Sequence, residues 1–228
     1  MPRKRAQALA APRTIRSRRD GAIASTCHIV TADGTCSGFH LRLRPALRCA
    51  SGTALRREPL SVVVTAKHAL PSPTRARGEV TTGDYGGRSA SWAALDPTKL
   101  WIASAHQDLA LCAVELGAPS ATPLYVMSGD ADHKTTRLAI VHHEEGRTKR
   151  LTPTSAVFAS HTGIFLTDAI TGEGSSGAPV FCAGSWCVMG VVTSLNSVRI
   201  DAREVPLLEC AFLDPFLDEL AQLGYEPA

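Results

Sequence analysis

Short apolar runs, separated by turn residues, recur along most of the chain and limit what it can fold into. Examples are LSVVVTA (60–66), DLALCAVEL (108–116), APVFCA (178–183) and WCVMGVVTSL (186–195). Runs of about four to eight apolar or alternating residues are typical of strands and are too short for most helices. Their recurrence, with turns between them, predicts an all-β sandwich or barrel.

A single segment near the C-terminus has the pattern of a helix instead. In DPFLDELAQLGY (214–225), Asp214 is a favoured N-cap residue and Pro215 a favoured first helical residue. Apolar residues follow at helical spacing on one face, namely Phe216, Leu217, Leu220 and Leu223. We therefore expect one C-terminal helix in an all-β chain.

The size and composition of the chain allow a substantial hydrophobic core. Of its 228 residues, 44% are apolar and 20% are charged, so global disorder is not expected. This length suits one large domain or two packed lobes. The turn-rich segment GAPSATP (117–123) has the composition of a connector. We place the lobe boundary there, which gives an N-terminal lobe (21–118) and a C-terminal lobe (119–228).

Residues 1–20 carry the excess positive charge of a chain whose net charge is +3. They hold seven of the 24 Lys and Arg residues but only one of the 21 acids, Asp20. They lack the continuous apolar stretch of a secretory signal, although their Arg-rich composition faintly resembles an organelle transit peptide. We expect a disordered tail, with weak contact to nucleic acid or anionic surfaces as an alternative role. No run is long enough for a membrane span, and we expect a cytoplasmic protein.

The seven cysteines show no C-x-x-C spacing, so neither a zinc site nor any other metal or cofactor is expected. An odd number of cysteines without an export signal favours reduced thiols. A turn at Gly184 and Ser185 would place Cys182 opposite Cys187 on a hairpin. We expect these two cysteines to be small apolar fillers rather than a disulfide.

The segment TGEGSSGAPV (171–180) places glycines around two serines, directly before an apolar strand. A simple turn is one explanation. The other is a loop that presents one hydroxyl and a pair of backbone N–H groups. A serine nucleophile needs a base, usually His, and the His needs a third group to orient it. His68 directly follows one predicted strand and Asp108 directly precedes another, so the chain supplies both partners for Ser176.

Five short motifs stand out in the sequence. Three of them contain His68, Asp108 and Ser176, and the other two lie in further predicted strands. In chain order they are TCSGFHL (35–41), TAKH (65–68), DLAL (108–111), GSSGAPV (174–180) and GVVTS (190–194). Together they resemble the trypsin- and chymotrypsin-like serine proteases, of the bacterial or viral type with short loops. The resemblance covers roughly residues 21–225. It implies two six-stranded Greek-key β-barrels packed together, followed by a C-terminal helix.

The resemblance also implies a serine endopeptidase that acts on protein or peptide substrates through an acyl-enzyme. Ser176 would attack the scissile carbonyl, His68 would transfer the proton and Asp108 would orient the imidazole. The backbone N–H groups of Gly174 and Ser176 would form the oxyanion hole. Thr193 lies where the family keeps a hydroxyl that supports the buried Asp.

The substrate pocket follows from the same resemblance. Ile170 would lie at its base beside Thr171, Val192 would line it, and residues 193–195, including Ser194 and Leu195, would pair with the substrate backbone. There is no acid at the base, so a preference for Lys or Arg before the scissile bond is not expected. Val192 stands where glutamate-specific relatives carry His. We therefore expect a small or medium apolar residue before the scissile bond.

Ser175 departs from the family pattern. Zymogens of this family keep an Asp at this position, and that Asp pairs with a newly cut amino terminus. A serine cannot form this ion pair, so we expect hydrogen bonds to hold the loop and no activation cleavage of that type.

Three other readings of the sequence remain open. The same fold could be a catalytically silent peptide-binding module, although the complete triad argues against it. His142 and His143 could suggest a metal, but neighbouring residues of a strand point to opposite faces, and we expect both to be surface or loop residues. His106 is the rival base for Ser176, in a context that matches nothing in the family.

Overall fold

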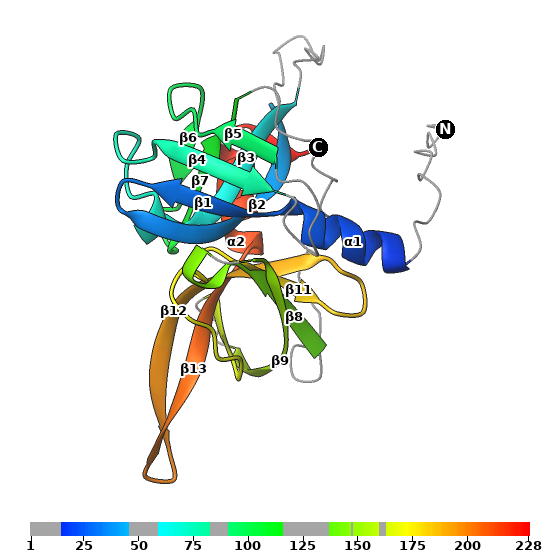
Figure 1. Ribbon diagram of the computed structural model, residues 1–228, viewed down its shortest axis with the longest axis vertical. Helices are drawn as coiled ribbons and strands as arrows, with labels where there is room; N and C mark the ends of the chain where they lie inside the picture. Colours follow the sequence, from blue (N-terminus) through cyan, green and yellow to red (C-terminus); the bar gives the residue numbers. More distant parts are fainter. Residues whose placement is uncertain (1–14, 46–58, 83–90, 116–136, 147, 160–162) are drawn as a thin grey trace, which may run out of the picture.

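The chain folds into two β-sheet lobes stacked on one another, as the computed structural model shows (Figure 1). The structure describes residues 15–45, 59–82, 91–115, 137–146, 148–159 and 163–228. The predicted lobe boundary at 118 and 119 lies outside these residues, as does Cys49, one of the seven cysteines. The prediction of a two-lobed, all-β fold is confirmed.

The N-terminal lobe is a curled sheet with the strand order β5-β4-β1-β2-β3-β7-β6, and β14 pairs with β2. Its strands are β1 (Thr26–Thr31), β2 (Gly34–Pro45), β3 (Leu60–Ala66), β4 (Gly78–Thr82), β5 (Ser91–Ala94), β6 (Trp101–Ala103), β7 (Leu109–Ala113) and β14 (Tyr225–Pro227). An isolated bridge between Leu95 and Val114 brings the end of β5 to the end of β7. The described part of this lobe therefore has eight strands rather than the six expected, because β1 to β7 make seven and the C-terminal segment adds β14.

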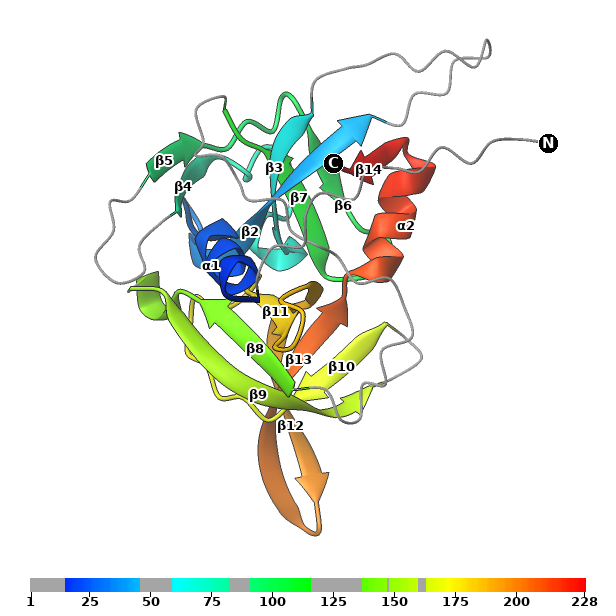
Figure 2. The same ribbon diagram turned by 90° about the vertical axis from the view of Figure 1, so that its right-hand side faces the viewer.

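The C-terminal lobe is a closed six-stranded barrel with the strand order β10-β13-β12-β11-β8-β9, as expected (Figure 2). Its strands are β8 (Arg137–His142), β9 (Arg150–Ala159), β10 (Ile164–Thr167), β11 (Pro179–Cys182), β12 (Val188–Ile200) and β13 (Arg203–Phe212). Gly190 allows close packing here, since a Cβ at this position would collide with the carbonyl oxygen of Ala211 on β13. Such close backbone approach is a common reason for a glycine within a strand.

A shared apolar core fixes the two lobes against each other. One cluster of buried side chains draws Val64 and Leu111 from the first lobe and Phe181 and Val191 from the second. The central strands β3 and β7 are buried along most of their length, which explains their almost continuous apolar sequence. The ends of these strands lie at the lobe interface, where His68 follows β3 and Asp108 precedes β7.

Helix α1 (Ile15–Ser25) precedes the first strand. Residues 15–20 are therefore helical, which corrects the prediction of a disordered tail for that part of it. The Nζ atom of Lys149 donates to the carbonyl of Ile23 at 2.8 Å, and the guanidinium of Arg19 lies 5.7 Å from the centre of the Trp186 ring. These contacts hold the helix against the C-terminal barrel.

The C-terminal helix α2 spans Asp214–Gln222, and Pro215 lies in its first turn as expected. Phe216 and Leu220 are fully buried, whereas Leu223 falls just beyond the helix and is 60% exposed. None of the described helices is long and apolar enough to cross a membrane.

Cys182 and Cys187 face each other across the expected hairpin, with Cys182 N donating to Cys187 O at 3.0 Å, and both thiols are free.

A buried histidine in β2 should make the stability of the fold depend on pH. His40 is 2% exposed, and its Nε2 atom has no hydrogen-bond partner in the described part of the chain. Burial, with a contribution from Arg42, lowers the pKa of His40 from 6.5 to about 4. Between these values the unfolded chain binds a proton that the folded chain does not, so stability falls as the pH falls through this window. The loss from His40 alone is about 1.4 kcal/mol per pH unit and on the order of 3 kcal/mol in total.

Urea unfolding at pH 7 and pH 4.5 measures this effect. We expect a His40→Leu variant to lose less stability than the parent between the two pH values. His106→Asn serves as the matched control because His106 is exposed and should leave the pH dependence unchanged. Equal pH dependence in the His40→Leu variant and the parent would contradict the assignment.

Candidate active site

His68 and Asp108 meet because the strands that carry them are antiparallel neighbours. Ala66, the last residue of β3, lies opposite Leu109, the first residue of β7. A short 3₁₀ turn, η1 (Lys67–Ala69), follows β3 and holds His68, while Asp108 directly precedes β7. The His68 Nδ1 and Asp108 Oδ2 atoms are 2.6 Å apart, and the backbone N–H of His68 donates to Asp108 Oδ1 at 2.9 Å. One carboxylate therefore binds both the ring and the backbone of the histidine.

This contact determines which ring nitrogen of His68 carries the proton. An ionised carboxylate can only accept hydrogen bonds, so Nδ1 must donate and Nε2 is left as the basic nitrogen. The hydrogen bond to Asp108 and its negative charge raise the pKa of His68 above its ordinary value of 6.5, although partial burial acts in the opposite direction. The imidazole is therefore oriented and made more basic than a free histidine.

The loop that leads to Asp108 is held by residues that sequence reasoning missed. The Glu219 carboxylate on α2 accepts hydrogen bonds from Ser104 Oγ at 2.6 Å and from Ala105 N at 2.9 Å. The Gln107 amide donates to the carbonyl oxygens of Gly163 and Phe212 in the second lobe, at 3.1 and 3.0 Å. The C-terminal helix thus fixes the segment before Asp108, a contact with no signature in the sequence.

The loop with Ser176 packs against the end of β3. The backbone N–H of Ser37 donates to Ser176 O at 2.8 Å. Gly177 has φ +82°, and a Cβ there would collide with the Thr65 hydroxyl, three residues before His68, and with the Ser37 carbonyl. Only glycine suits this position, because both the backbone angle and the contact exclude a side chain. Within the described ranges, Ser176 and His68 share no hydrogen bond, and such bonds often tighten only when substrate binds.

Two carbonyl contacts fix the direction of the backbone N–H groups that follow them in this loop. The Glu173 carbonyl accepts from Glu145 N at 2.7 Å, and the Ser175 carbonyl accepts from Ala178 N at 3.0 Å. In a planar trans peptide the N–H points opposite to the carbonyl, so the N–H groups of Gly174 and Ser176 point away from these contacts. Gly174 has φ +84°, a conformation that favours glycine. The N–H groups of Gly174 and Ser176 are therefore the candidate donors to a negatively charged oxygen.

Buried hydrogen bonds hold Ser175, as its departure from the family pattern suggests. Its Oγ atom lies 2.9 Å from His142 Nδ1, and His142 Nε2 lies 2.9 Å from Thr152 Oγ1 on β9. Ser175 and His142 are each 2% exposed, and burial lowers the pKa of His142. The expectation that His142 and His143 are surface or loop residues is wrong for His142, which is buried at the end of β8. His143 does follow the strand in a loop, but it is buried as well. Among the described residues, no cluster of His, Cys, Asp and Glu could hold a metal ion.

A cavity of about 200 Å³ lies beside Ser176. Its lining includes four predicted pocket residues and five others, namely Thr171, Val192, Ser194, Leu195, Gly172, Glu173, Ser175, Ser176 and Leu208. Ile170 is not among them and is 74% exposed, so its predicted place at the base of the pocket is wrong.

The Thr193 hydroxyl donates to Glu209 O at 3.1 Å rather than to Asp108, because a bulge at this point of β12 turns Thr193 toward β13.

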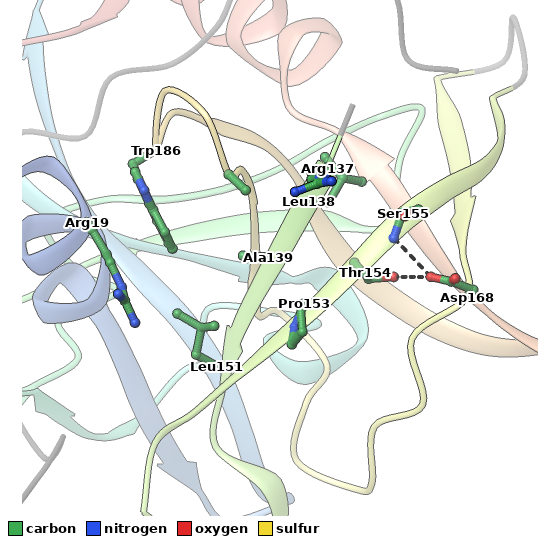
Figure 3. A pocket seen from close by; sticks show the side chains of 11 residues that line it. Arg19, Arg137, Leu138, Ala139, Leu151, Pro153, Thr154, Ser155, Asp168 and Trp186 are labelled. Carbon is green, nitrogen blue, oxygen red and sulfur yellow. Dashed lines mark hydrogen bonds between the residues drawn. The ribbon is translucent and has the colours of Figure 1, made fainter. Parts of the chain in front are cut away.

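A larger cavity, of about 540 Å³, lies on another part of the C-terminal barrel (Figure 3). Arg19 and Trp186 line one side of it, and Asp168 lines another, where it accepts hydrogen bonds from Thr154 Oγ1 and Ser155 N. This cavity contains none of the three candidate catalytic residues.

The N-terminal tail is described only in part. Four of its seven basic residues fall in 1–14, outside the described residues, so the weak contact of the tail with nucleic acid stays a prediction.

Comparisons with known proteins agree with this geometry. The family described as the trypsin-like peptidase domain matches residues 50–191, a range that includes His68, Asp108 and Ser176. The fold is similar to that of Deg5, with a TM-score of 0.59 and 16% identity over 92% of this chain and 95% of that chain. It is also similar to a serine endoprotease from Yersinia pestis, with a TM-score of 0.60 and 13% identity over 94% of this chain and 68% of that chain.

A third similar structure is the inactive form of the Rv3671c protease of M. tuberculosis. Its TM-score is 0.58 and its identity 16%, over 95% of this chain and 98% of that chain. At these low identities the three structures show a common fold. None of the curated proteins matches the chain in sequence.

Proposed function

Because the chain belongs to the trypsin-like peptidase family, we propose that it is a serine endopeptidase with His68, Asp108 and Ser176 as its catalytic residues. The observation that carries the proposal is the double contact of the Asp108 carboxylate with the backbone N–H and the ring Nδ1 of His68. This contact leaves Nε2 of His68 as a base. Of the three proposed catalytic residues, Ser176 carries the hydroxyl, and its loop packs against the end of β3.

In the proposed reaction, His68 Nε2 takes the proton of the Ser176 hydroxyl while Oγ attacks the carbonyl carbon of the scissile peptide bond. The carbonyl oxygen becomes negatively charged and accepts hydrogen bonds from the N–H groups of Gly174 and Ser176. Each such donor contributes roughly 3 kcal/mol in the transition state. The protonated His68 then gives its proton to the leaving amine, and water hydrolyses the resulting acyl-enzyme by the same steps.

The cavity beside Ser176 supports a small or medium apolar residue before the scissile bond. Its volume is about 200 Å³, and Val192 and Leu208 give it an apolar wall. Glu173 is the acid of this lining, and its side chain is exposed rather than buried at the base. A buried acid is what selects Lys or Arg in proteases of this kind, and that feature is missing from the described lining.

A fluorophosphonate probe tests whether Ser176 is an activated nucleophile. We expect the probe to label the full-length protein, because Ser176 Oγ displaces fluoride when His68 removes its proton. Labelling and peptide cleavage should both disappear in Ser176→Ala and remain in the matched variant Ser155→Ala, which changes an exposed hydroxyl outside the cavity beside Ser176. A folded protein without labelling would instead support a silent peptide-binding module and would contradict the proposal.

A further inference from the structure

Ser37 on β2 lies where the first lobe meets the loop that carries Ser176, and its side chain is fully buried, at 0% exposed. Its backbone N–H donates to Ser176 O at 2.8 Å. Its backbone carbonyl accepts from the hydroxyl of Thr65 at 2.7 Å. Thr65 belongs to β3, which ends just before His68. Ser37 therefore joins the serine loop to the strand that leads to the candidate base.

The side-chain hydroxyl of Ser37 makes two further hydrogen bonds, and chemistry fixes the direction of both. The backbone N–H of His143 lies 2.9 Å from Ser37 Oγ, and the carbonyl oxygen of Gly174 lies 2.8 Å from it. A backbone N–H can only donate and a carbonyl can only accept, so the single hydrogen of the hydroxyl must point to Gly174 O. One buried hydroxyl thus accepts from one loop and donates to another.

These bonds restrain Gly174, whose N–H is one of the two candidate donors to a negatively charged oxygen. Gly174 has φ +84°, and a glycine can adopt many other backbone angles where its neighbours do not restrain it. The peptide before Gly174 is held by the bond from Glu145 N to Glu173 O, at 2.7 Å. The peptide after it is held by the Ser37 hydroxyl and, on its N–H side, by a longer bond of 3.3 Å to the carbonyl of Gly172.

The segment that supports Gly174 from the other side is itself held by Ser37. A Cβ at Gly174 would lie 2.8 Å from His143 O and 3.2 Å from Glu145 N, so the two segments are in close contact. The bond from His143 N to Ser37 Oγ holds the start of this segment, and Glu145 N at its end holds the carbonyl of Glu173. Loss of the Ser37 hydroxyl therefore loosens both peptides that flank Gly174.

We propose that Ser37 is a positioning residue of the active site, whose hydroxyl holds the Gly174 N–H in the direction that binds the negatively charged oxygen of the transition state. This inference rests on the proposed endopeptidase function. Ser37 is fully buried, so it acts on the substrate only through Gly174. The alternative is that Ser37 only stabilises the contact between the two lobes.

Ser37→Ala tests the proposal, because it removes the hydroxyl and keeps the backbone bonds. We expect kcat for a short peptide to fall about tenfold while KM stays within about twofold of the parent value. The loss is smaller than the roughly 10²-fold cost of removing a whole oxyanion donor, because Glu145 still restrains one side of Gly174. Rates are expressed per active site, counted by complete labelling with a fluorophosphonate probe, so unfolded protein does not affect them.

A pair of inhibitors separates positioning from stability. A peptide aldehyde adds to Ser176 Oγ as a hemiacetal whose oxygen lies among the oxyanion donors, whereas the corresponding peptide alcohol binds without this bond. In Ser37→Ala, the inhibition constant of the aldehyde should rise by the same factor by which kcat/KM falls. The inhibition constant of the alcohol should not change. A purely structural role would change neither constant per active site.

Three further variants complete the experiment. Ser25→Ala is the matched control, because Ser25 is 1% exposed and its hydroxyl donates to the carbonyl of Ala22 at 2.8 Å, within helix α1. It should keep the kcat and the aldehyde affinity of the parent. Ser37→Thr keeps the hydroxyl and should restore most of kcat. Ser37→Cys keeps the size of the side chain with a weaker donor, so it should show the loss even if Ser37→Ala does not fold.

The outcomes separate this inference from the function on which it rests. A kcat per active site within about twofold of the parent for Ser37→Ala, or for Ser37→Cys if the alanine variant does not fold, would overturn the inference and leave the peptidase in place. A fall in kcat without weaker binding of the aldehyde would also overturn it, because the loss would then arise at another step. Absence of Ser176-dependent cleavage in the parent would overturn both.

Discussion

The Asp108→Asn variant is expected to lose about 10⁴-fold in kcat while its fold stays intact. The two oxygens of Asp108 have different partners, the backbone N–H of His68 on Oδ1 and the ring Nδ1 on Oδ2. A backbone N–H can only donate, so the amide oxygen of an asparagine must take the place of Oδ1. The amide NH₂ group then faces Nδ1, which must accept, and the ring proton moves to Nε2. The nitrogen that should take the proton of Ser176 is thereby blocked.

Steady-state kinetics with a short peptide substrate measure this loss, and thermal unfolding checks the fold. The parent activity should rise with pH through the pKa of His68, which lies above 6.5 because of Asp108, since only the neutral ring acts as a base. In the variant this midpoint should move to lower pH, because the carboxylate that raised it is gone. His106→Ala should retain the activity of the parent. A kcat within tenfold of the parent for Asp108→Asn would remove Asp108 from the mechanism.

The order and strand positions of the three catalytic candidates could be predicted because they depend on local signals. A buried strand ends at Ala66 and another begins at Leu109, so residues at those points must lie at one edge of a sheet. Apolar, β-branched sequences define the strands almost unambiguously. The glycines and serines around Ser176 likewise predicted a loop at that position. The antiparallel pairing of β3 with β7 then brings two distant residues together.

The contacts that hold these residues in place could not be read from the sequence, because they join side chains from distant elements. Glu219 on α2 fixes the loop before Asp108, and nothing near Glu219 in the sequence indicates this. Thr193 was assigned by its position in a motif, yet a bulge in β12 directs its hydroxyl to Glu209. His142 was expected at the surface or in a loop because neighbouring residues of a strand point to opposite faces, and a buried histidine with two hydroxyl partners looks in sequence like a surface one. Tertiary packing decides each of these cases.

The second prediction with a large effect concerns His142. We expect His142→Phe to lower kcat by about 10²-fold and to change KM for a short peptide much less. His142 joins the hydroxyl of Ser175, which is buried, to that of Thr152, which is half-buried. Its loss leaves the Ser175 hydroxyl buried without this partner, at a cost of about 1–3 kcal/mol. Ser175 separates the two candidate oxyanion donors, Gly174 and Ser176, so a shift of Ser175 misaligns both. Losing one such donor costs about 10²–10³-fold in kcat, which sets the scale of the effect.

Two further variants distinguish positioning from simple loss of stability. His142→Asn can keep the bond to Ser175 and should recover part of kcat. Ser175→Ala combined with His142→Phe removes the unpaired hydroxyl of Ser175, so the double variant should be more stable than the sum of the single changes predicts. Measurements of kcat, KM and urea unfolding on the same samples separate the two effects. If kcat and the fraction of folded protein fall in equal proportion in every variant, His142 supports the barrel alone and has no part in shaping the oxyanion loop.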